Sequence, residues 1–118
     1  MRQVEFTDEF AAWWDTLDEA EQDAVDQGVD LLEESGPALG RPHVDTLKGS
    51  KHANMKELRA TARNRPLRVL FAFDPRRMAI LLIGGDKGGD SRFYERTIPL
   101  ADKLYDQHLE ELKREGLI

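Results

Sequence analysis

Residues 66–84 of this sequence read PLRVLFAFDPRRMAILLIG, two apolar runs joined by a polar segment. The runs, 66–74 and 78–84, have the length and the apolar content of β-strands, and the segment Asp74-Pro75-Arg76-Arg77 has the residue types of a tight turn. Strands that are apolar on both faces lie in the middle of a sheet that is covered on each side. The stretch therefore predicts a central β-hairpin.

The N-terminal third predicts a short strand followed by two helices. Residues 1–6 alternate weakly, and Thr7 is a suitable cap for a first helix because its side chain can accept a bond from a free backbone N–H group. A second helix is expected from Asp18, which has Glu21 at capping-box spacing, to the stop signal at residues 35–37. An aromatic and aliphatic inner stripe marks the first helix: Phe10, Trp13, Trp14 and Leu17. Together these elements predict a helical hairpin.

The remaining segments complete the expected order of elements. Residues 36–53 hold two prolines, three glycines and no clear period, which indicates an extended loop, and residues 54–60 then predict a strand. A last helix is expected to begin near Pro99 and to end at Gly116. We therefore expect one α+β domain over residues 1–118, with the helical hairpin packed on a small antiparallel or mixed four-stranded sheet and a C-terminal helix.

Several classes of function are disfavoured by what the sequence lacks. It has no cysteine, and His43, His52 and His108 do not have metal-ligand spacing, so we expect neither a metal nor a cofactor. The glycine-rich segment GGDKGGD, residues 84–90, does not have the spacing of a phosphate-binding P-loop. No basic leader is visible, and no apolar run approaches the roughly 18 residues of a membrane span. A cytoplasmic protein without membrane contact is therefore expected.

The net charge of −6 is distributed unevenly along the chain. Residues 1–36 carry twelve acidic side chains against one arginine, a net charge of −11. Residues 37–100 carry thirteen Lys or Arg against six acids, a net charge of +7, and the last eighteen residues have a net charge of −2. Because surface potential follows local charge, the middle of the chain is suited to binding phosphates. Solvated charge on exposed faces is the alternative explanation.

Two strand arginines in this basic middle suggest chemistry on RNA. RNA is cleaved without a metal when the neighbouring 2′-hydroxyl attacks the phosphate, which requires a base, an acid and cations that stabilise the transition state. Arginine suits the cationic role because its guanidinium binds two phosphate oxygens. A short turn between their strands would bring Arg59 and Arg68 together. The alternative for Arg59 is a salt bridge with Glu57, whereas Arg68 lies in an apolar run where an unpaired charge is costly.

Other residues are candidates for supporting roles. Lys87 in the glycine-rich segment can approach a ligand closely, or it is a solvated lysine at a hairpin tip. Of Phe93 and Tyr94, one is expected to fill the core and the other to stack on a base. His52 has a side chain that titrates near neutrality, although it can equally be an exposed histidine without a role. We interpret Lys48, Lys51 and Lys56, together with His52, as RNA-binding residues that guide the backbone.

The stretches LKGSKHANMKELRA, RPLRVLFAF and AILLIGGDKGG, in this order, resemble toxins of the RelE/ParE superfamily, especially the HigB or phage Gp49-like branch. The resemblance implies a RelE-like fold, cleavage of messenger RNA on the ribosome, and a helix-turn-helix antitoxin that binds the toxin in a hetero-oligomer. It implies catalytic roles for four residues. Arg59 and Arg68 match strand arginines that handle phosphate, Lys87 matches a basic residue after the last strand, and Tyr94 matches an aromatic residue that orients RNA.

The sequence also departs from the family pattern. Family toxins tend to be basic, whereas this chain is acidic, and Met55 and Glu57 stand where RelE itself has lysines. The general base is therefore left unassigned. Two alternative functions stay open: a ParE-like toxin that inhibits DNA gyrase and needs no nuclease site, and a remnant that binds an antitoxin without being toxic.

Overall fold

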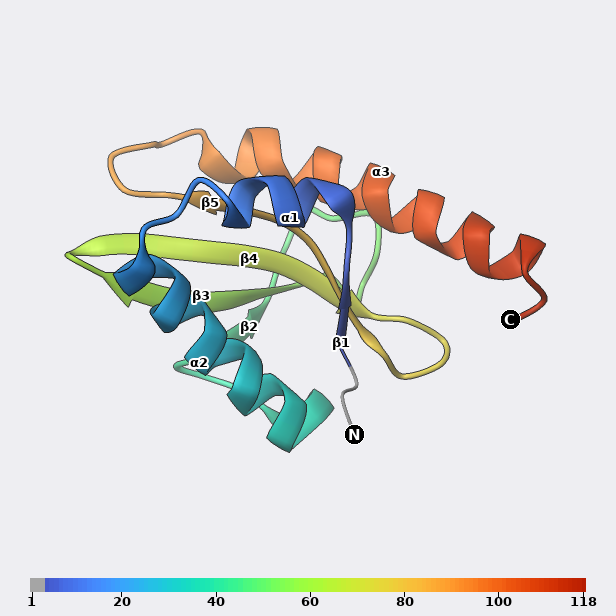
Figure 1. The fold of residues 1–118 in the computed structure, drawn as a ribbon. Helices are drawn as coiled ribbons and strands as arrows, with labels where there is room; N and C mark the ends of the chain where they lie inside the picture. Colours follow the sequence, from blue (N-terminus) through green and yellow to red (C-terminus); the bar gives the residue numbers. More distant parts are fainter. Residues whose placement is uncertain (1–3) are drawn as a thin grey trace.

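The computed structural model describes residues 4–118, and residues 1–3 of the predicted first strand lie outside that range. Figure 1 shows the arrangement of the elements along the chain. They are β1 (Val4–Phe6), α1 (Asp8–Trp14), α2 (Glu19–Ser35), the short 3-10 helix η1 (Gly36–Ala38), β2 (Val44–Thr46), β3 (Lys56–Ala62), β4 (Arg65–Phe73), β5 (Ala79–Asp86) and α3 (Phe93–Arg114).

The strands form one five-stranded mixed sheet in the order β1-β5-β4-β3-β2. Strand β1 is parallel to β5, and the other pairs are antiparallel. The central hairpin of β4 and β5 is confirmed, with a turn closed by the Arg77 N–H group, which donates to the Asp74 carbonyl at 2.7 Å. The α+β class is confirmed, but the expected number of four strands was wrong. Strand β2 lies within the predicted loop 36–53, and it pairs Val44 with Leu58 of β3.

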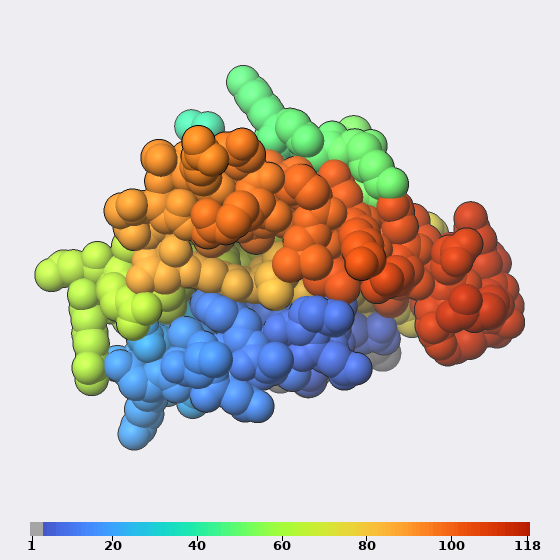
Figure 2. Space-filling model, turned by 90° about the horizontal axis from the view of Figure 1, so that it is seen from above, coloured from blue at the N-terminus to red at the C-terminus, as the bar shows by residue number. Residues whose placement is uncertain are grey.

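The sheet separates two apolar layers. Helices α1 and α2 pack on one face, where the helix residues Phe10, Val25 and Leu32 meet the strand residues Leu58, Val69, Phe71 and Leu81. Helix α3 packs on the other face, where Phe93, Ile98, Ala101 and Leu104 meet Leu70, Ala72, Ile80 and Leu82. Figure 2 shows α1 and α3 on either side of β5. Neighbouring residues of β4 therefore belong to opposite faces, which explains why this strand is apolar throughout.

The N-terminal helix signals are confirmed, whereas the start of the last helix was placed wrongly. The Thr7 side chain accepts a hydrogen bond from the Phe10 N–H group, and Asp18 forms a complete capping box with Glu21. Helix α3 begins at Phe93, six residues before Pro99. Pro99 is exposed, so the backbone hydrogen bond that it cannot make is lost on the solvent side of the helix. Gly116 has the positive φ of 71° expected where the helix ends.

The ends of the strands position the basic residues. Strand β3 begins and ends two residues later than the predicted range 54–60, and Arg63 and Asn64 make its turn into β4 with φ values of 52° and 64°. Two successive residues with positive φ are typical of the tightest hairpin turn, which fixes the register of the two strands. Within residues 4–118, no helix is both long enough and apolar enough to span a bilayer.

Candidate active site

Arg59 and Arg68 are directly opposite each other on the antiparallel strands β3 and β4. Directly opposed residues share a face of the sheet, with side chains about 5 Å apart at Cβ. The neighbours Leu58, Leu67 and Val69 all belong to the core layer of α1 and α2. Since side chains alternate along a strand, both arginines project toward the α3 face. The tight turn at Arg63 and Asn64 therefore brings the two predicted arginines together.

The two guanidinium groups share the carboxylate of Glu57, which precedes Arg59 by two residues on the same face. Glu57 is 3% exposed. The Arg59 Nε atom donates to Glu57 Oε2 at 3.1 Å, and the Arg68 Nε atom lies 3.6 Å from Glu57 Oε1. The salt bridge considered for Arg59 from the sequence is therefore present. A buried carboxylate between two arginines holds both cations at one place and offsets part of their mutual repulsion.

Tyr94, in the first turn of α3, brings a phenol to the same carboxylate. Its hydroxyl donates to Glu57 Oε1 at 2.5 Å. Burial, and secondarily the hydrogen bond to Glu57, raises the pKa of Tyr94, so the phenol is protonated at neutral pH. Phe93 is buried in the core under α3, which leaves Tyr94 as the member of the aromatic pair that faces the arginines.

Lys87 lies beside Tyr94 in the segment between β5 and α3. Its Nζ atom is 5.3 Å from the centre of the Tyr94 ring, a cation–π distance. The Lys87 N–H group donates to the Pro66 carbonyl at 3.0 Å, which anchors the glycine-rich segment to the start of β4. Three of the four residues predicted to be catalytic, Arg59, Arg68 and Tyr94, thus meet at Glu57, and the fourth, Lys87, lies beside Tyr94.

Gly85 of β5 makes room for this arrangement. It pairs with Arg68 across the sheet, and a Cβ atom at this position would lie 2.7 Å from the Phe93 ring. Phe93 therefore packs directly on the backbone of β5. This contact fixes the first turn of α3, and with it the position of Tyr94 next to the two arginines.

Arg68 has hydrogen-bonding capacity that the protein does not use. Its side chain is 12% exposed, and its Nη1 group donates to the Leu67 carbonyl at 3.0 Å. Among the buried side-chain nitrogen and oxygen atoms of residues 4–118, the Nε atom of Arg68 is the one without a hydrogen-bond partner. The 3.6 Å separation from Glu57 is too long for a hydrogen bond. A buried unsatisfied donor is costly unless a ligand completes it.

A second carboxylate lies on the outer side of Arg59. The Arg59 Nη2 group donates to Asp45 of β2 at 3.2 Å, and Arg41 donates to the same oxygen at 2.8 Å. The hydrogen bond from Arg41 lowers the pKa of Asp45, so the carboxylate is ionised at neutral pH. Because Arg41 and Asp45 balance each other, the cluster of Arg59, Arg68, Lys87 and Glu57 has two positive charges in excess.

The residues interpreted as RNA guides are not part of this cluster. Lys51 forms an ion pair with Asp106 of α3, and His52 Nε2 lies 2.8 Å from the other oxygen of the same carboxylate. Asp106 is twelve residues after Tyr94, about 18 Å further along the helix. Lys56 belongs to the opposite face of β3 from Glu57, and Lys48 is exposed in the loop after β2. Their role in binding RNA stays a prediction.

Glu57 is the site residue that sequence reasoning missed. It was considered only as a salt-bridge partner of Arg59, because its burial under α3 depends on contacts between distant segments. A signal was present in the sequence. Glu57 and Arg59 occupy alternate positions of one strand, so their opposite charges share one face of the sheet.

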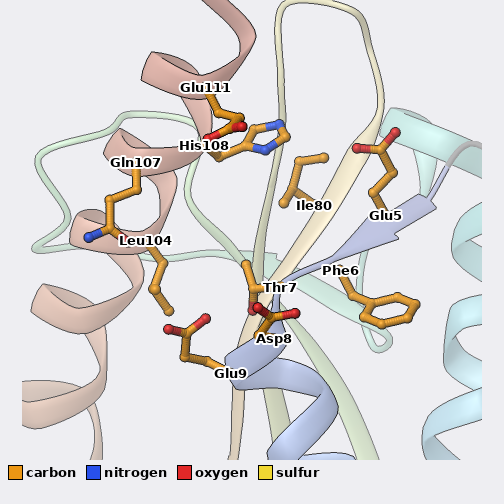
Figure 3. Close-up of a pocket in the computed structure, with 10 residues that line it drawn as sticks. All are labelled: Glu5, Phe6, Thr7, Asp8, Glu9, Ile80, Leu104, Gln107, His108 and Glu111. Atoms are coloured by element: carbon orange, nitrogen blue, oxygen red, sulfur yellow. The ribbon is translucent and has the colours of Figure 1, made fainter. Parts of the chain in front are cut away.

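The cleft in Figure 3 lies away from this cluster, between the start of α1 and the second half of α3. It has a volume of about 350 Å³ and is lined by the acids Glu5, Asp8, Glu9 and Glu111. No group of three or more His, Cys, Asp or Glu residues within the described part of the chain is placed to hold a metal ion. An acidic cleft repels phosphates, so it is a poor site for RNA.

The order of elements and the packing of α3 on the sheet define a RelE-type fold. A chain of the archaeal RelE–RelB complex from Pyrococcus horikoshii OT3 has the same architecture, with a TM-score of 0.53 at 18% sequence identity. The match covers 75% of this chain and 97% of that chain. The predicted RelE-like fold is therefore confirmed.

Sequence comparison shows the family. The model of the phage-derived Gp49-like proteins matches residues 12–106, and this chain belongs to that family. Two relatives from Mycobacterium tuberculosis (strain H37Rv) are named "Putative toxin HigB2", 45% identical over 87% of this chain, and "Putative toxin HigB3", 49% identical over 82%. The chain spans about half (52%) of the length of the HigB2 relative and 84% of the HigB3 relative. The resemblance to the HigB and Gp49-like branch is confirmed.

Proposed function

We propose that this protein is the toxin of a toxin–antitoxin pair and that it is a metal-independent endoribonuclease, which cleaves messenger RNA on the ribosome in the cytoplasm. The observation that carries the proposal is the convergence of Arg59, Arg68 and Tyr94 on the carboxylate of Glu57. This set supplies a proton acceptor, a proton donor and two permanent cations within one hydrogen-bonded cluster. Those are the groups that cleavage through a 2′-hydroxyl requires.

The arginines bind the phosphate at the bond to be cleaved. Arg59 is 34% exposed on its side chain, so it can contact a ligand while it keeps its bond to Glu57. Arg68 contributes a second positive charge beside Arg59, on a side chain that is 12% exposed. As the 2′-oxygen attacks, negative charge builds up on the phosphate oxygens, and guanidinium groups already fixed by Glu57 stabilise it without having to reorganise. Lys87, whose Nζ atom lies 5.3 Å from the centre of the Tyr94 ring, adds a third positive charge.

The protons can be followed through the same cluster. Glu57 accepts the proton of the 2′-hydroxyl while the 2′-oxygen forms its bond to phosphorus. Tyr94, which is protonated because its pKa is raised, gives its proton to the 5′-oxygen as the bond between phosphorus and that oxygen breaks. The products are a 2′,3′-cyclic phosphate and a 5′-hydroxyl. The hydrogen bond between Tyr94 and Glu57 then returns the proton from the carboxyl group to the phenolate, which restores both groups.

A partner antitoxin belongs to the proposal. The relatives from Mycobacterium tuberculosis carry toxin names, and the archaeal chain with the same fold comes from a RelE–RelB complex. We expect a protein encoded beside this one, with a helix-turn-helix domain, to bind the chain in a hetero-oligomer and to block its activity.

The test is expression from a tightly regulated promoter, followed by mapping of the 5′ ends of cellular transcripts. We expect growth arrest and new 5′-hydroxyl ends inside translated messages. The variant R68A should remove these ends, because loss of one phosphate-stabilising donor slows such chemistry by about 10²-fold or more. The matched control is R114A, which removes an arginine paired with Glu111 at the far end of α3.

Two outcomes would contradict the proposal. Growth arrest with intact messages and damaged DNA would favour gyrase inhibition instead. Cleavage that survives in both R59A and R68A, with both proteins folded, would show that the arginine cluster is not the nuclease site.

A further inference from the structure

A groove of about 380 Å³ lies on the face of the sheet opposite the arginines, between β1, α1 and α2. Its apolar walls are Phe6, Phe10, Trp14 and Val29, and Leu81 of β5 forms part of the floor. The ring of Phe6 lies 6.0 Å from that of Phe10, and the ring of Phe10 lies 6.3 Å from that of Trp14. These rings form a continuous aromatic row along one side of the groove.

Phe6 is the feature that the fold leaves unexplained. It is 63% exposed, the highest exposure of any large hydrophobic residue in the described part of the chain. Figure 3 shows its ring directed away from α3. Thr7, the next residue, is used to cap α1 and to bind the Leu82 carbonyl, so the backbone here is fixed. An aromatic ring held in solvent beside an apolar groove is characteristic of an interaction site.

Unpaired acids surround this groove. Asp15 and Asp26 line it, and neither has an ion-pair partner within residues 4–118. Asp23, three residues before Asp26, and Asp30, four residues after it, are likewise unpaired on α2 among the described residues. In contrast, the acids of α2 that face the strand turn, such as Glu21, are paired with arginine. The negative charge around the groove is therefore available to a partner.

We propose that this groove binds a short amphipathic helix of a protein partner, with large apolar side chains on one face and Lys or Arg beside them. Apolar side chains of the partner would pack on the row of Phe6, Phe10 and Trp14, and its cations would meet Asp15 and Asp26. Two helices bound the groove, and a helix in a groove of this kind is a recurring mode of peptide recognition. The acids disfavour an anionic membrane surface and a second copy of the equally acidic helical hairpin.

The position of the groove has a consequence for the proposed function. The groove belongs to the α1 and α2 face, whereas Arg59 and Arg68 belong to the α3 face. A helix in the groove would therefore leave the arginine cluster uncovered. The inference rests on the proposed function in one respect: the antitoxin is the partner expected to carry this helix. Binding here would attach the antitoxin to the toxin by a contact separate from the one that blocks the nuclease site.

The test uses a synthetic 15-residue Leu/Lys peptide with leucines at helical spacing, and binding is read from the fluorescence of Trp13 and Trp14. We expect F6S to weaken binding about tenfold or more, because a buried aromatic contact is lost. D26K should weaken binding severalfold, and this loss should shrink at high salt. E110K, with the same change of charge on α3, is the matched control and should bind like the unchanged protein.

Two further peptides test whether binding depends on the positive charge of the peptide and on the helical spacing of its leucines. A Leu/Glu peptide with the same spacing, and a Leu/Lys peptide of the same composition with alternating leucines, should each bind at least about tenfold more weakly. Equal binding of the two Leu/Lys peptides, or unchanged binding by F6S and D26K, would overturn the proposal. F6S should cleave RNA at the normal rate, so failure of the groove proposal is distinguishable from failure of the nuclease proposal, which is tested with R68A.

Discussion

Replacing Glu57 tests the centre of the candidate site, because this one carboxylate holds three other groups in place. It accepts hydrogen bonds from Arg59 and Tyr94 and faces the buried Nε atom of Arg68. The variant E57A would leave the Arg68 charge buried without a counter-charge. Removing one member of a buried ion pair costs about 3–5 kcal/mol. Since Arg59 is one-third exposed and regains water, we expect the lower end of that range.

The variant E57Q separates catalysis from stability. Gln keeps one oxygen that can accept a hydrogen bond, so the loss of stability should be about 1–2 kcal/mol. A small domain has a stability of about 5–15 kcal/mol, and E57Q should therefore remain folded at 25 °C. The amide cannot take up the proton of the 2′-hydroxyl, so cleavage should fall by about 10²–10⁴-fold.

Stability is measured by urea unfolding, with the fluorescence of Trp13 and Trp14 as the signal. Activity is measured on a defined translated message in a purified translation system, at protein concentrations where each variant is folded. Y94F is the comparison, because it removes the phenol proton and leaves the carboxylate. If E57Q cleaves within about threefold of the unchanged protein, Glu57 only positions the arginines, and the assignment of the base is wrong.

Two further predictions concern stability alone. G85A should destabilise the protein by about 1–3 kcal/mol in urea unfolding, because the added methyl group would lie against Phe93, and an unchanged midpoint would contradict the packing. Burial alone would raise the pKa of Asp74, but the stronger combined effect of hydrogen bonds from His108 and Arg76 lowers it. Asp74 therefore adds stability above the pKa of the unfolded chain, about 3.9, and this contribution is lost as the pH falls through the folded-state pKa. D74N should cost about 2–4 kcal/mol at pH 7 and less at pH 3, and an equal loss at both values would contradict the argument.

The parts of the fold that the sequence predicts are those set by local chemistry. The apolar runs of β4 and β5 can only be central strands, and Thr7 and Asp18 cap their helices through contacts three residues away. Strand β2 was missed because three residues are too few to show a period, and its pairing with β3 is what makes it a strand. The start of α3 was missed because Pro99 suits a first helical turn, whereas the packing of Phe93 against Gly85 starts the helix earlier.

In the candidate site, too, the sequence predicts what local structure sets and misses what contacts between distant segments set. Arginines on neighbouring strands joined by a tight turn can be expected to meet, since the turn fixes their register. The position of Glu57 in the site could not be predicted in the same way, because its burial depends on Tyr94, 37 residues later in the chain. His52 shows the opposite case. Its residue type suggested chemistry, but Asp106 of α3 holds it away from the arginines, and only the packing of α3 on the loop reveals this.

The acidic composition, which seemed to conflict with binding RNA, is consistent with it once the charges are placed in space. The net charge of −11 in residues 1–36 is concentrated on the helical hairpin, on one face of the sheet. The arginine cluster, with its excess of two positive charges, faces the other way. A polyanion such as ribosomal RNA would repel the hairpin and attract the opposite face. The charge distribution would therefore orient the protein with its arginines toward the RNA. If the arginine face is turned toward RNA, the same separation leaves the acidic groove exposed to a cationic partner. Neutralising the hairpin acids should therefore weaken both the groove contact and the orientation, whereas neutralising an arginine should weaken cleavage and the orientation and leave the groove contact unchanged.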